Sequence, residues 1–412
     1  NGAWVQVGQD IDGEAAGDNS GHSVSLSSDG NTMAIGAVYN NGNGYAAGHV
    51  RIYNYNGSSW QQIGADIDGE YAWDQSGNSV SLSSDGNIVA IGSRYNDGNG
   101  NNSGHVRIYN YNGSSWVQLG NDIDAEGTVD EFSGWSVSLS SNGNTVAIGA
   151  PHNDGTGSDA GHVRIYNWNG TSWLQIGQDI DGEAAGDESG TSVSLSDDGN
   201  TIAIGAPFNN SNKGHTRVYH FDGNSWIQIG QDIDGEAGGD QSGSSVCLSS
   251  DGNIVAIGAY ANSGNGWSAG HVRIYNLNGG YWIQLGDDID GEAAHDWTGC
   301  SVSLSSDGHS VAIGAYGNDE TASQAGHVRI FNWDSTSWVQ YGVDIDGEAG
   351  DNYSGFSVSM NSDGNILAIG APENDGNGTD AGHVRVYNLS ALTNSNGCDS
   401  TAILNLTINN ST

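Results

Sequence analysis

A tryptophan recurs at nearly constant spacing along the chain, and this repeat limits the folds that the sequence can adopt. Successive copies are separated by 56, 56, 57, 53, 56 and 56 residues, at Trp4, Trp60, Trp116, Trp173, Trp226, Trp282 and Trp338. A repeat of about this length is typical of a solenoid, a propeller or another array. It argues against the two or three separate domains that 412 residues would otherwise suggest.

Each repeat contains four short segments with the alternation of β-strands. In the third copy they read "SWVQLG", "SVSLS", "TVAIGA" and "HVRIYN", and turn sequences such as "SSNG" and "NGTSW" separate them. No segment has helical periodicity. Four antiparallel strands repeated seven times predict an all-β fold, a seven-bladed β-propeller of four-stranded blades. A solenoid is the alternative, but it needs distinct end caps, and none is evident.

The repeats also predict how the ring closes. The chain starts with a tryptophan strand at residues 4–8, whereas the last repeat ends near Asn388 without one. We therefore expect the first strand to complete the blade built from residues 357–388, which removes a free sheet edge. The predicted propeller spans residues 1–389, with repeats starting near residues 1, 56, 112, 169, 222, 278 and 334. Residues 390–412 are expected to be a C-terminal linker or the start of a following module.

An acidic loop follows each tryptophan strand. Its first copy, "DIDGEAAGD", places carboxylates at positions 1, 3, 5 and 9 of the loop. The corresponding residues are Asp10, Asp12, Glu14 and Asp18; Asp66, Asp68, Glu70 and Asp74; Asp122, Asp124, Glu126 and Asp130; Asp179, Asp181, Glu183 and Asp187; Asp232, Asp234, Glu236 and Asp240; Asp288, Asp290, Glu292 and Asp296; and Asp344, Asp346 and Glu348. In the last copy Asn352 takes the fourth position.

The overall charge excludes one class of partner and favours another. The chain has 49 acidic residues against 9 lysines and arginines, a net charge of −40. Such a protein repels nucleic acid, so nucleic-acid binding is excluded, while cation binding is favoured. No apolar run approaches the ~20 residues of a membrane span, so membrane insertion is not expected either.

Calcium is the cation that the acidic loops suggest. Ca²⁺ takes several oxygen ligands, and closely spaced carboxylates would otherwise repel one another. The alternative is that the first two carboxylates of each loop hydrogen-bond to turn amides and to a neighbouring blade's histidine or arginine. The sequence leaves both interpretations open.

Histidine and arginine stand in register in every "GHVRIY" strand, for example at His49 and Arg51. A period of two residues places them on the same side of the strand. A ring of anion-binding cations is one interpretation. We favour a structural role, because a charge repeated between packed blades needs a partner and the acidic loop can supply it.

Aromatic residues interrupt the otherwise small and polar loops, and they are the candidate ligand-binding residues. They are Tyr71, Trp73, Trp135, Trp267, Trp297 and Tyr353. Aromatic rings are common platforms for sugars and protein ligands, although these rings could instead pack on neighbouring loops. The sequence contains no G-x-S-x-G motif, no histidine spacing typical of metal ligands and no phosphate loop. We therefore expect a non-enzymatic protein, with a glycan-degrading enzyme as the less favoured alternative.

The segments "SGWSV", "GNTVAIGAP" and "AGHVRIYN" resemble the FG-GAP repeat of integrin-α-type propellers, and "GAP" is intact at Pro151, Pro207 and Pro372. The resemblance implies an extracellular or cell-surface protein that binds a glycan or protein ligand, with a calcium-dependent lectin as the alternative. The FG-GAP calcium loop lies between the "SV" and "GAP" strands, where this chain has only a short "SSDGN" turn, so that calcium site cannot be transferred. The tail is similar to segments of large secreted bacterial surface proteins, which implies a longer multidomain chain.

Overall fold

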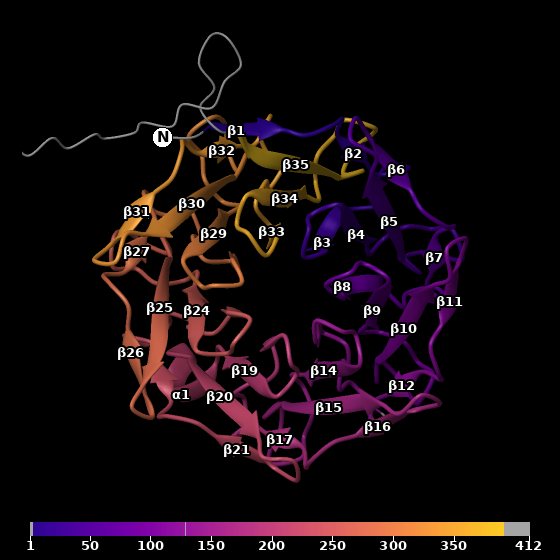
Figure 1. Ribbon diagram of the computed structural model, residues 1–412, viewed down its shortest axis with the longest axis horizontal. Coiled ribbons are helices and arrows are strands. Elements are labelled where there is room, and N and C mark those ends of the chain that lie inside the picture. The colour runs from indigo at the N-terminus through magenta and orange to yellow at the C-terminus, as the bar shows by residue number, and fades with distance from the viewer. Residues whose placement is uncertain (1–2, 128, 391–412) are drawn as a thin grey trace, which may run out of the picture.

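Seven β-sheets surround a central axis in the computed structural model, which describes residues 3–127 and 129–390 (Figure 1). Each sheet has four antiparallel strands and a fifth, two-residue strand beside the third; the four are sequential in six sheets, and in the seventh the N-terminal strand joins the last three. The predicted seven-bladed all-β propeller is confirmed. The expectation for the tail concerns residues that lie almost wholly outside the described part of the chain.

The strands fall into five sets, from the axis outwards. The first set is β3 (Ser20–Leu26), β8 (Ser76–Leu82), β13 (Ser136–Leu139), β18 (Ser192–Leu195), β23 (Ser245–Leu248), β28 (Ser301–Leu304) and β33 (Ser357–Met360). The second is β4 (Thr32–Ala37), β9 (Ile88–Ser93), β14 (Thr145–Ala150), β19 (Thr201–Ala206), β24 (Ile254–Ala259), β29 (Ser310–Ala315) and β34 (Ile366–Ala371). The third is β5 (His49–Tyr55), β10 (His105–Tyr111), β15 (His162–Trp168), β20 (His215–Phe221), β25 (His271–Asn278), β30 (His327–Trp333) and β35 (His383–Ser390).

The tryptophan strands form the outer edge. They are β1 (Ala3–Gln6), β6 (Trp60–Gln62), β11 (Trp116–Gln118), β16 (Trp173–Gln175), β21 (Trp226–Gln228), β26 (Tyr281–Gln284) and β31 (Trp338–Gln340). The two-residue strands are β2 (Ile11–Asp12), β7 (Ile67–Asp68), β12 (Ile123–Asp124), β17 (Ile180–Asp181), β22 (Ile233–Asp234), β27 (Ile289–Asp290) and β32 (Ile345–Asp346). The one helix among the described residues is α1 (Asn209–Asn212). No helix in that part of the chain has the length and apolar character needed to cross a bilayer.

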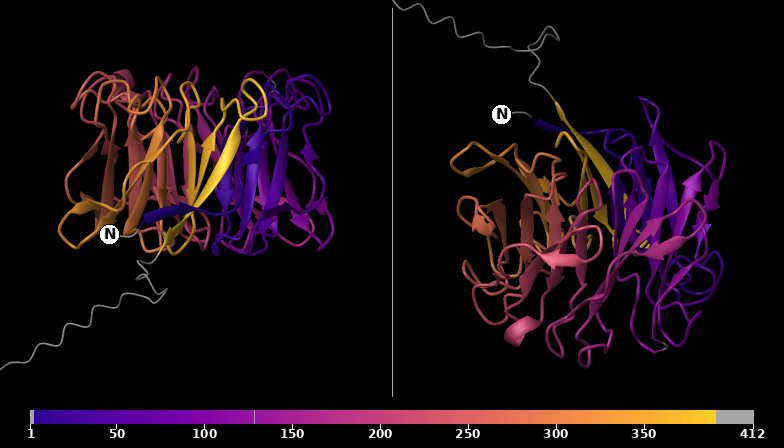
Figure 2. Two further views of the ribbon diagram at one scale, coloured as in Figure 1. Left: turned by 90° about the horizontal axis from the view of Figure 1, so that it is seen from above. Right: turned by 60° about the horizontal axis from the view of Figure 1, so that its bottom comes forward.

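The first and last strands close the ring as predicted. Strand β1 pairs antiparallel with β35, from Ala3 opposite Ser390 to Gln6 opposite Tyr387. Figure 2 shows β1, in indigo, lying across the yellow β35. The N-terminal strand therefore covers the edge that the last blade would otherwise expose.

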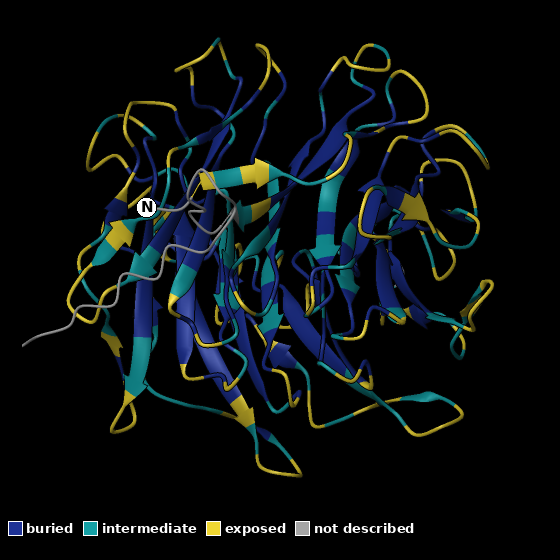
Figure 3. Cartoon of the chain, turned by 45° about the horizontal axis from the view of Figure 1, so that its top comes forward, coloured by how far each residue is buried: buried dark blue, intermediate teal, exposed yellow. Residues whose placement is uncertain are grey.

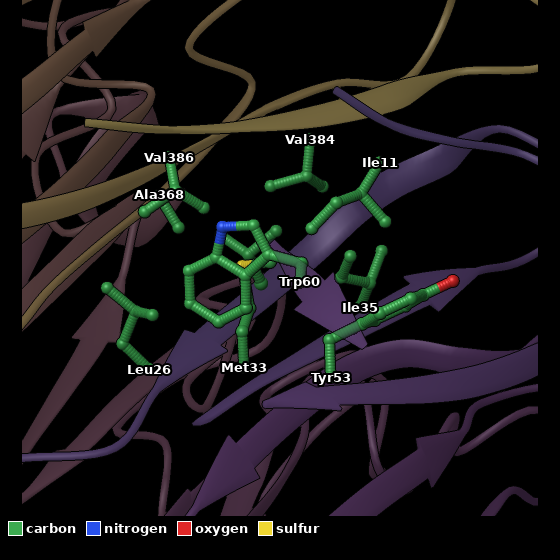
Figure 4. Close-up of a cluster of buried hydrophobic side chains, with 10 residues drawn as sticks. Ile11, Leu26, Met33, Ile35, Tyr53, Trp60, Ala368, Val384 and Val386 are labelled. Carbon is green, nitrogen blue, oxygen red and sulfur yellow. The ribbon is translucent and has the colours of Figure 1, made fainter. Parts of the chain in front are cut away.

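The hydrophobic core lies between adjacent blades rather than at one centre. In one of the seven clusters, Met33 and Ile35 of β4 face Val384 and Val386 of β35 (Figure 4). Ile11 joins this cluster, which explains why the acidic loop carries a buried isoleucine between two aspartates. Figure 3 shows the resulting pattern of buried strands and exposed loops. Each fully buried aliphatic side chain contributes about 1.5–3 kcal/mol.

Serine and glycine in the inner strands let the blades approach closely. Ser23 Oγ donates to the Gly77 carbonyl of the next blade at 2.8 Å. A Cβ atom at Gly36 would lie 2.1 Å from the same carbonyl oxygen. The repeated "SVSLS" and "AIGA" segments are thus requirements of the contact between blades.

A ring of backbone hydrogen bonds joins the "SSDG" hairpins around the axis. Ser28 N donates to Ser84 O at 2.9 Å, the same bond follows from blade to blade, and Ser362 N donates back to Ser28 O at 3.1 Å. On the outer edge, each tryptophan indole donates to the carbonyl that directly follows the outer strand of the preceding blade, as Trp60 Nε1 does to Val7 O at 3.0 Å. These contacts explain the strict spacing of the tryptophans.

Candidate functional site

The acidic loops and the loops between the second and third strands lie on the same side of the ring. Gly17 N donates to Thr379 O at 2.8 Å, and Asn377 Nδ2 donates to Gly13 O at 2.7 Å. We call this side the loop face; it is the upper side in the left view of Figure 2. The negative charge of the seven acidic loops is therefore gathered on one face of the protein.

The first carboxylate of each loop is held by the glutamine of the preceding tryptophan strand. The pairs are Gln6–Asp10, Gln62–Asp66, Gln118–Asp122, Gln175–Asp179, Gln228–Asp232, Gln284–Asp288 and Gln340–Asp344. In each pair the amide donates to one carboxylate oxygen. The second oxygen of Asp66 lies 3.8 Å from Nδ1 of His49, so this oxygen faces the buried histidine.

The second and third acidic residues reach the next blade. Arg51 Nη2 donates to the backbone carbonyl of Asp12 at 2.6 Å, and Arg51 Nη1 lies 3.9 Å from Glu14 Oε1. The other six arginines of the repeat make the same bond to the second aspartate of the preceding loop, at 2.6–2.7 Å: Arg107, Arg164, Arg217, Arg273, Arg329 and Arg385. The predicted structural role of the repeated arginine is confirmed.

The fourth acidic residue is buried and fixes the turn. Asp18 is 1% exposed, and its Oδ2 accepts hydrogen bonds from Ala15 N at 2.9 Å and from Asn40 Nδ2 at 3.0 Å. Asp74, Asp187, Asp240 and Asp296 are also buried and accept the same backbone bond. These carboxylates therefore fix the turn of their own loop. Asp18, Asp74 and Asp187 also accept from an asparagine of the next blade, at 3.0–3.1 Å.

The third copy departs from the predicted pattern. Its loop is one residue longer, and Glu131 rather than Asp130 receives the amide of Asn153, at 3.0 Å. Asp130 is exposed and accepts from Asn102 Nδ2 at 2.8 Å. The extra residue also accounts for the 57-residue spacing of this repeat. Because of it, the acid that reaches the buried position is Glu131, one place later than in the other copies.

The acidic side chains gather in sets that cross the blade boundary. Ligand atoms of Glu14, His49 and Asp66 lie within 4.8 Å of one another, and so do those of Asp10, Glu348 and His383. In each set the glutamate comes from one blade, and the histidine and aspartate come from the next. The fourth carboxylate is engaged elsewhere, by the turn amides. A cation on this face would therefore bridge two blades rather than sit inside one loop.

Burial controls the charges in these sets. Burial, together with the adjacent Arg51, lowers the pKa of His49 to about 4, so this imidazole is neutral at pH 7. Burial also raises the pKa of Glu14, and the carboxylate of Asp66 raises it further. Both shifts reflect the cost of placing charges in a partly desolvated seam between blades.

The predicted aromatic residues divide into two groups. Tyr71, Trp73 and Trp267 are 67%, 58% and 73% exposed. Trp73 also pairs with Tyr45, with the ring centroids 4.6 Å apart. These rings are available to a ligand on the loop face.

The other three predicted aromatics are half-buried against neighbours. Trp135 stacks on the Arg94 guanidinium, whose central carbon lies 4.7 Å from the ring centroid. Trp297 and Tyr353 both contact Tyr316, with centroids 4.9 and 5.7 Å apart. Packing against neighbouring side chains therefore explains why these three positions are aromatic. The repeat pattern did not identify the packing partners, Arg94 and Tyr316.

A cavity of about 600 Å³ lies beside Trp267. The acidic loop at residues 236–240 forms one wall, with Glu236 and Asp240, and the loop at residues 261–268 forms the other. The cavity thus combines an exposed indole face with hydrogen-bond acceptors.

The central channel opens on the loop face through one residue from each blade: His22, Asn78, Trp135, Thr191, Ser244, Cys300 and Phe356. Trp135 and Phe356 contribute the aromatic rings at this opening. Burial raises the pKa of the Cys300 thiol to about 11, so it is protonated at pH 7 and is a poor nucleophile.

Comparison with known proteins supports the fold alone. No family model matches the chain, and no curated protein matches it. Among solved structures, a Kuenenia stuttgartiensis hydrazine synthase matches with a TM-score of 0.56 and 13% identity, over 89% of this chain and 94% of that one. The Myceliophteria thermophila Cps50 (Swd1) β-propeller domain matches with a TM-score of 0.57 and 11% identity, over 93% of this chain and 99% of that one.

Proposed function

We propose that this chain is a non-enzymatic, extracellular ligand-binding propeller whose loop face binds a cell-surface glycan or protein. The observation that carries the proposal is the cavity beside Trp267, where an indole that is 73% exposed stands next to the Glu236 carboxylate, whose side chain is 51% exposed. An indole face packs on the apolar side of a sugar ring, and carboxylates accept hydrogen bonds from its hydroxyl groups.

Divergence among the repeats supports this location. The position of Trp267 carries Ser158 in the third copy and Ser323 in the sixth, so the fold does not require an aromatic residue there. The same position carries Tyr45 in the first copy, beside Trp73. An exposed aromatic that the scaffold does not need is suited to ligand contact.

Substitution of Trp267 tests the proposal. Trp267→Ser restores a residue that other copies carry, so the melting temperature should stay unchanged while binding on a glycan array falls at least about tenfold. Tyr281→Ser is the matched control, because Tyr281 is 66% exposed but lies on the outer strand β26. Equal binding by the wild type and the Trp267 variant would contradict the proposed site.

We further propose that calcium ions stabilise the loop face. Carboxylates of adjacent loops supply hard oxygen ligands across each blade boundary. Bound calcium would stabilise only the folded state, by about 2.7 kcal/mol per site at a hundredfold excess over Kd.

Millimolar calcium should therefore raise the melting temperature by several degrees, and a chelator should reverse the shift. Sodium chloride at matched ionic strength should do much less, because screening is nonspecific. Joint substitution of Asp10→Asn and Asp12→Asn should remove one site's share of the calcium effect. Asp222→Asn is the control, since equivalent positions carry Asn56 and Asn112. Equal shifts with calcium and sodium would rule out specific sites.

The calcium-dependent lectin is the second candidate, favoured by the exposed Glu236 carboxylate beside Trp267. In a lectin of this kind the ion contacts sugar hydroxyls, so chelation would abolish binding while the protein is still folded. In the first candidate chelation lowers stability and leaves binding by the folded protein intact. Release of cleaved sugars during the same assay would instead identify a glycan-degrading enzyme.

A further inference from the structure

One blade carries a fourth ligand at its boundary with the preceding blade. Ligand atoms of Glu292, Glu320, His327 and Asp344 lie within 4.8 Å of one another. Glu320 occupies the position that is Gly42 in the first copy, so this carboxylate is an addition to the repeat. Glu292 belongs to the acidic loop after β27. The other three residues belong to the next blade: Glu320 to the loop between β29 and β30, His327 to β30, and Asp344 to the segment just before β32.

The buried histidine points into this cluster with an unused nitrogen. His327 is 0% exposed, and neither of its ring nitrogens has a hydrogen-bond partner. Its Nδ1 lies 3.9 Å from Asp344 Oδ2, too far for a hydrogen bond. Buried polar atoms are rarely left without a partner unless a water or an ion completes them.

Neighbouring groups hold the carboxylates in suitable orientations. Gln340 Nε2 donates to Oδ1 of Asp344, which leaves Oδ2 facing the histidine. Arg329 Nη1 lies 3.6 Å from Glu292 Oε1 and offsets part of the negative charge. Such outer contacts are typical of groups that orient metal ligands.

We propose that Glu292, Glu320, His327 and Asp344 bind a divalent transition-metal ion, with zinc as the best-fitting probe, and that this ion links the two blades. One imidazole and three carboxylates make a four-ligand set that zinc accepts in tetrahedral geometry. Imidazole favours zinc over calcium, which takes oxygen ligands. The ligand atoms must approach to about 3.3 Å from one another, given metal–ligand bonds of about 2.0–2.1 Å. Glu292 and Glu320 are exposed and can rotate inwards. This inference does not depend on the proposed ligand-binding function.

The other boundaries offer weaker versions of the site. Glu14, His49 and Asp66 repeat the set without a fourth carboxylate, and both nitrogens of His49 also lack partners. We therefore expect one tight zinc site and a class of weaker ones.

Titration of the chelator-treated, dialysed protein with zinc chloride, and separately with calcium chloride, tests the proposal by calorimetry. The wild type should show one zinc site at least about tenfold tighter than the rest, and tighter than any calcium site. Glu320→Gly should remove that tight site without lowering the melting temperature of the metal-free protein, because glycine is the residue of the first copy. Glu373→Gln, which removes a charge from a similar loop outside the cluster, should leave zinc binding unchanged.

X-ray absorption of the protein loaded with one equivalent of zinc supplies a second measurement. A single imidazole in the zinc shell, lost in His327→Asn, would support the assignment. The proposal is overturned if Glu320→Gly binds zinc as the wild type does, if zinc binds no more tightly than calcium, or if the spectrum shows oxygen ligands only.

Discussion

Deletion of residues 1–9 should open the ring, lower the melting temperature by well over ten degrees and cause aggregation. The deletion removes β1, which pairs with β35 through four residues, and leaves the outer edge of the last blade exposed. It also removes Trp4, which packs on the cluster between the last two blades and donates to Tyr341 O at 3.2 Å. Removal of a packed tryptophan alone costs about 3–5 kcal/mol.

Two single substitutions separate strand pairing from packing. Trp4→Ala should lower the free energy of unfolding by about 3 kcal/mol, since the strand remains but the indole is lost. Val5→Thr should change it by less than about 0.5 kcal/mol, because Val5 is 51% exposed. Thermal and urea unfolding, together with light scattering, would measure these effects. An unchanged melting temperature after the deletion would show that β1 does not close the ring in solution.

The architecture could be predicted from the sequence because each blade repeats the same short sequence patterns. The tryptophan spacing, the "SSDG" turns and the alternation in the strands all act over a few residues, so they can be identified without long-range information. Ring closure also follows, since residues 4–8 supply the strand that the last repeat lacks. The partnership of the repeated arginine with the acidic loop was predictable from charge alone.

The arrangement of the carboxylates was not predictable from the loop sequence. Four carboxylates within the nine residues of "DIDGEAAGD" suggest one shared ligand set, but Asp12 lies in the short strand β2 and Asp18 turns inwards to Asn40. The direction of each side chain depends on pairing with a strand far away in the sequence. The buried Ile11 was the available signal for β2, because an isolated apolar residue between aspartates needs a core contact.

The additional carboxylate at Glu320 was visible in the sequence as a departure from glycine. Its place in a metal-ligand cluster could be seen only in the structure, because His327 and Glu292 approach Glu320 from two different elements of the fold. Likewise, exposure separates Trp267 from Trp297, although both interrupt polar loops. The residues common to all repeats identify the scaffold, and residues that differ from the repeat, such as Glu320 and Trp267, indicate candidate sites.

Replacement of one repeated arginine should be among the most damaging single substitutions in the protein. Arg164 is 5% exposed; its Nη2 donates to Asp124 O at 2.7 Å, and its Nη1 lies 3.7 Å from Glu126. Its guanidinium also lies over Tyr166, 5.6 Å from the ring centroid. Arg164→Met should cost about 1.5–3 kcal/mol, because it removes a charge-assisted hydrogen bond to the Asp124 carbonyl. The Glu126 carboxylate adds little, because its side chain is 49% exposed and water can solvate it.

A surface lysine provides the control with the same change in charge. Lys213 Nζ lies 4.0 Å from a carboxylate oxygen of Asp234, whose side chain is 57% exposed, and such surface pairs contribute about 0–1 kcal/mol. Urea unfolding of Lys213→Met should therefore match the wild type closely, while Arg164→Met unfolds at clearly lower urea. Both variants lose one of the nine lysines and arginines, so a difference between them cannot come from net charge. If the two variants were equally stable, the acidic loops would not serve as links between blades, and binding of cations or ligands would be the remaining reason for their charge.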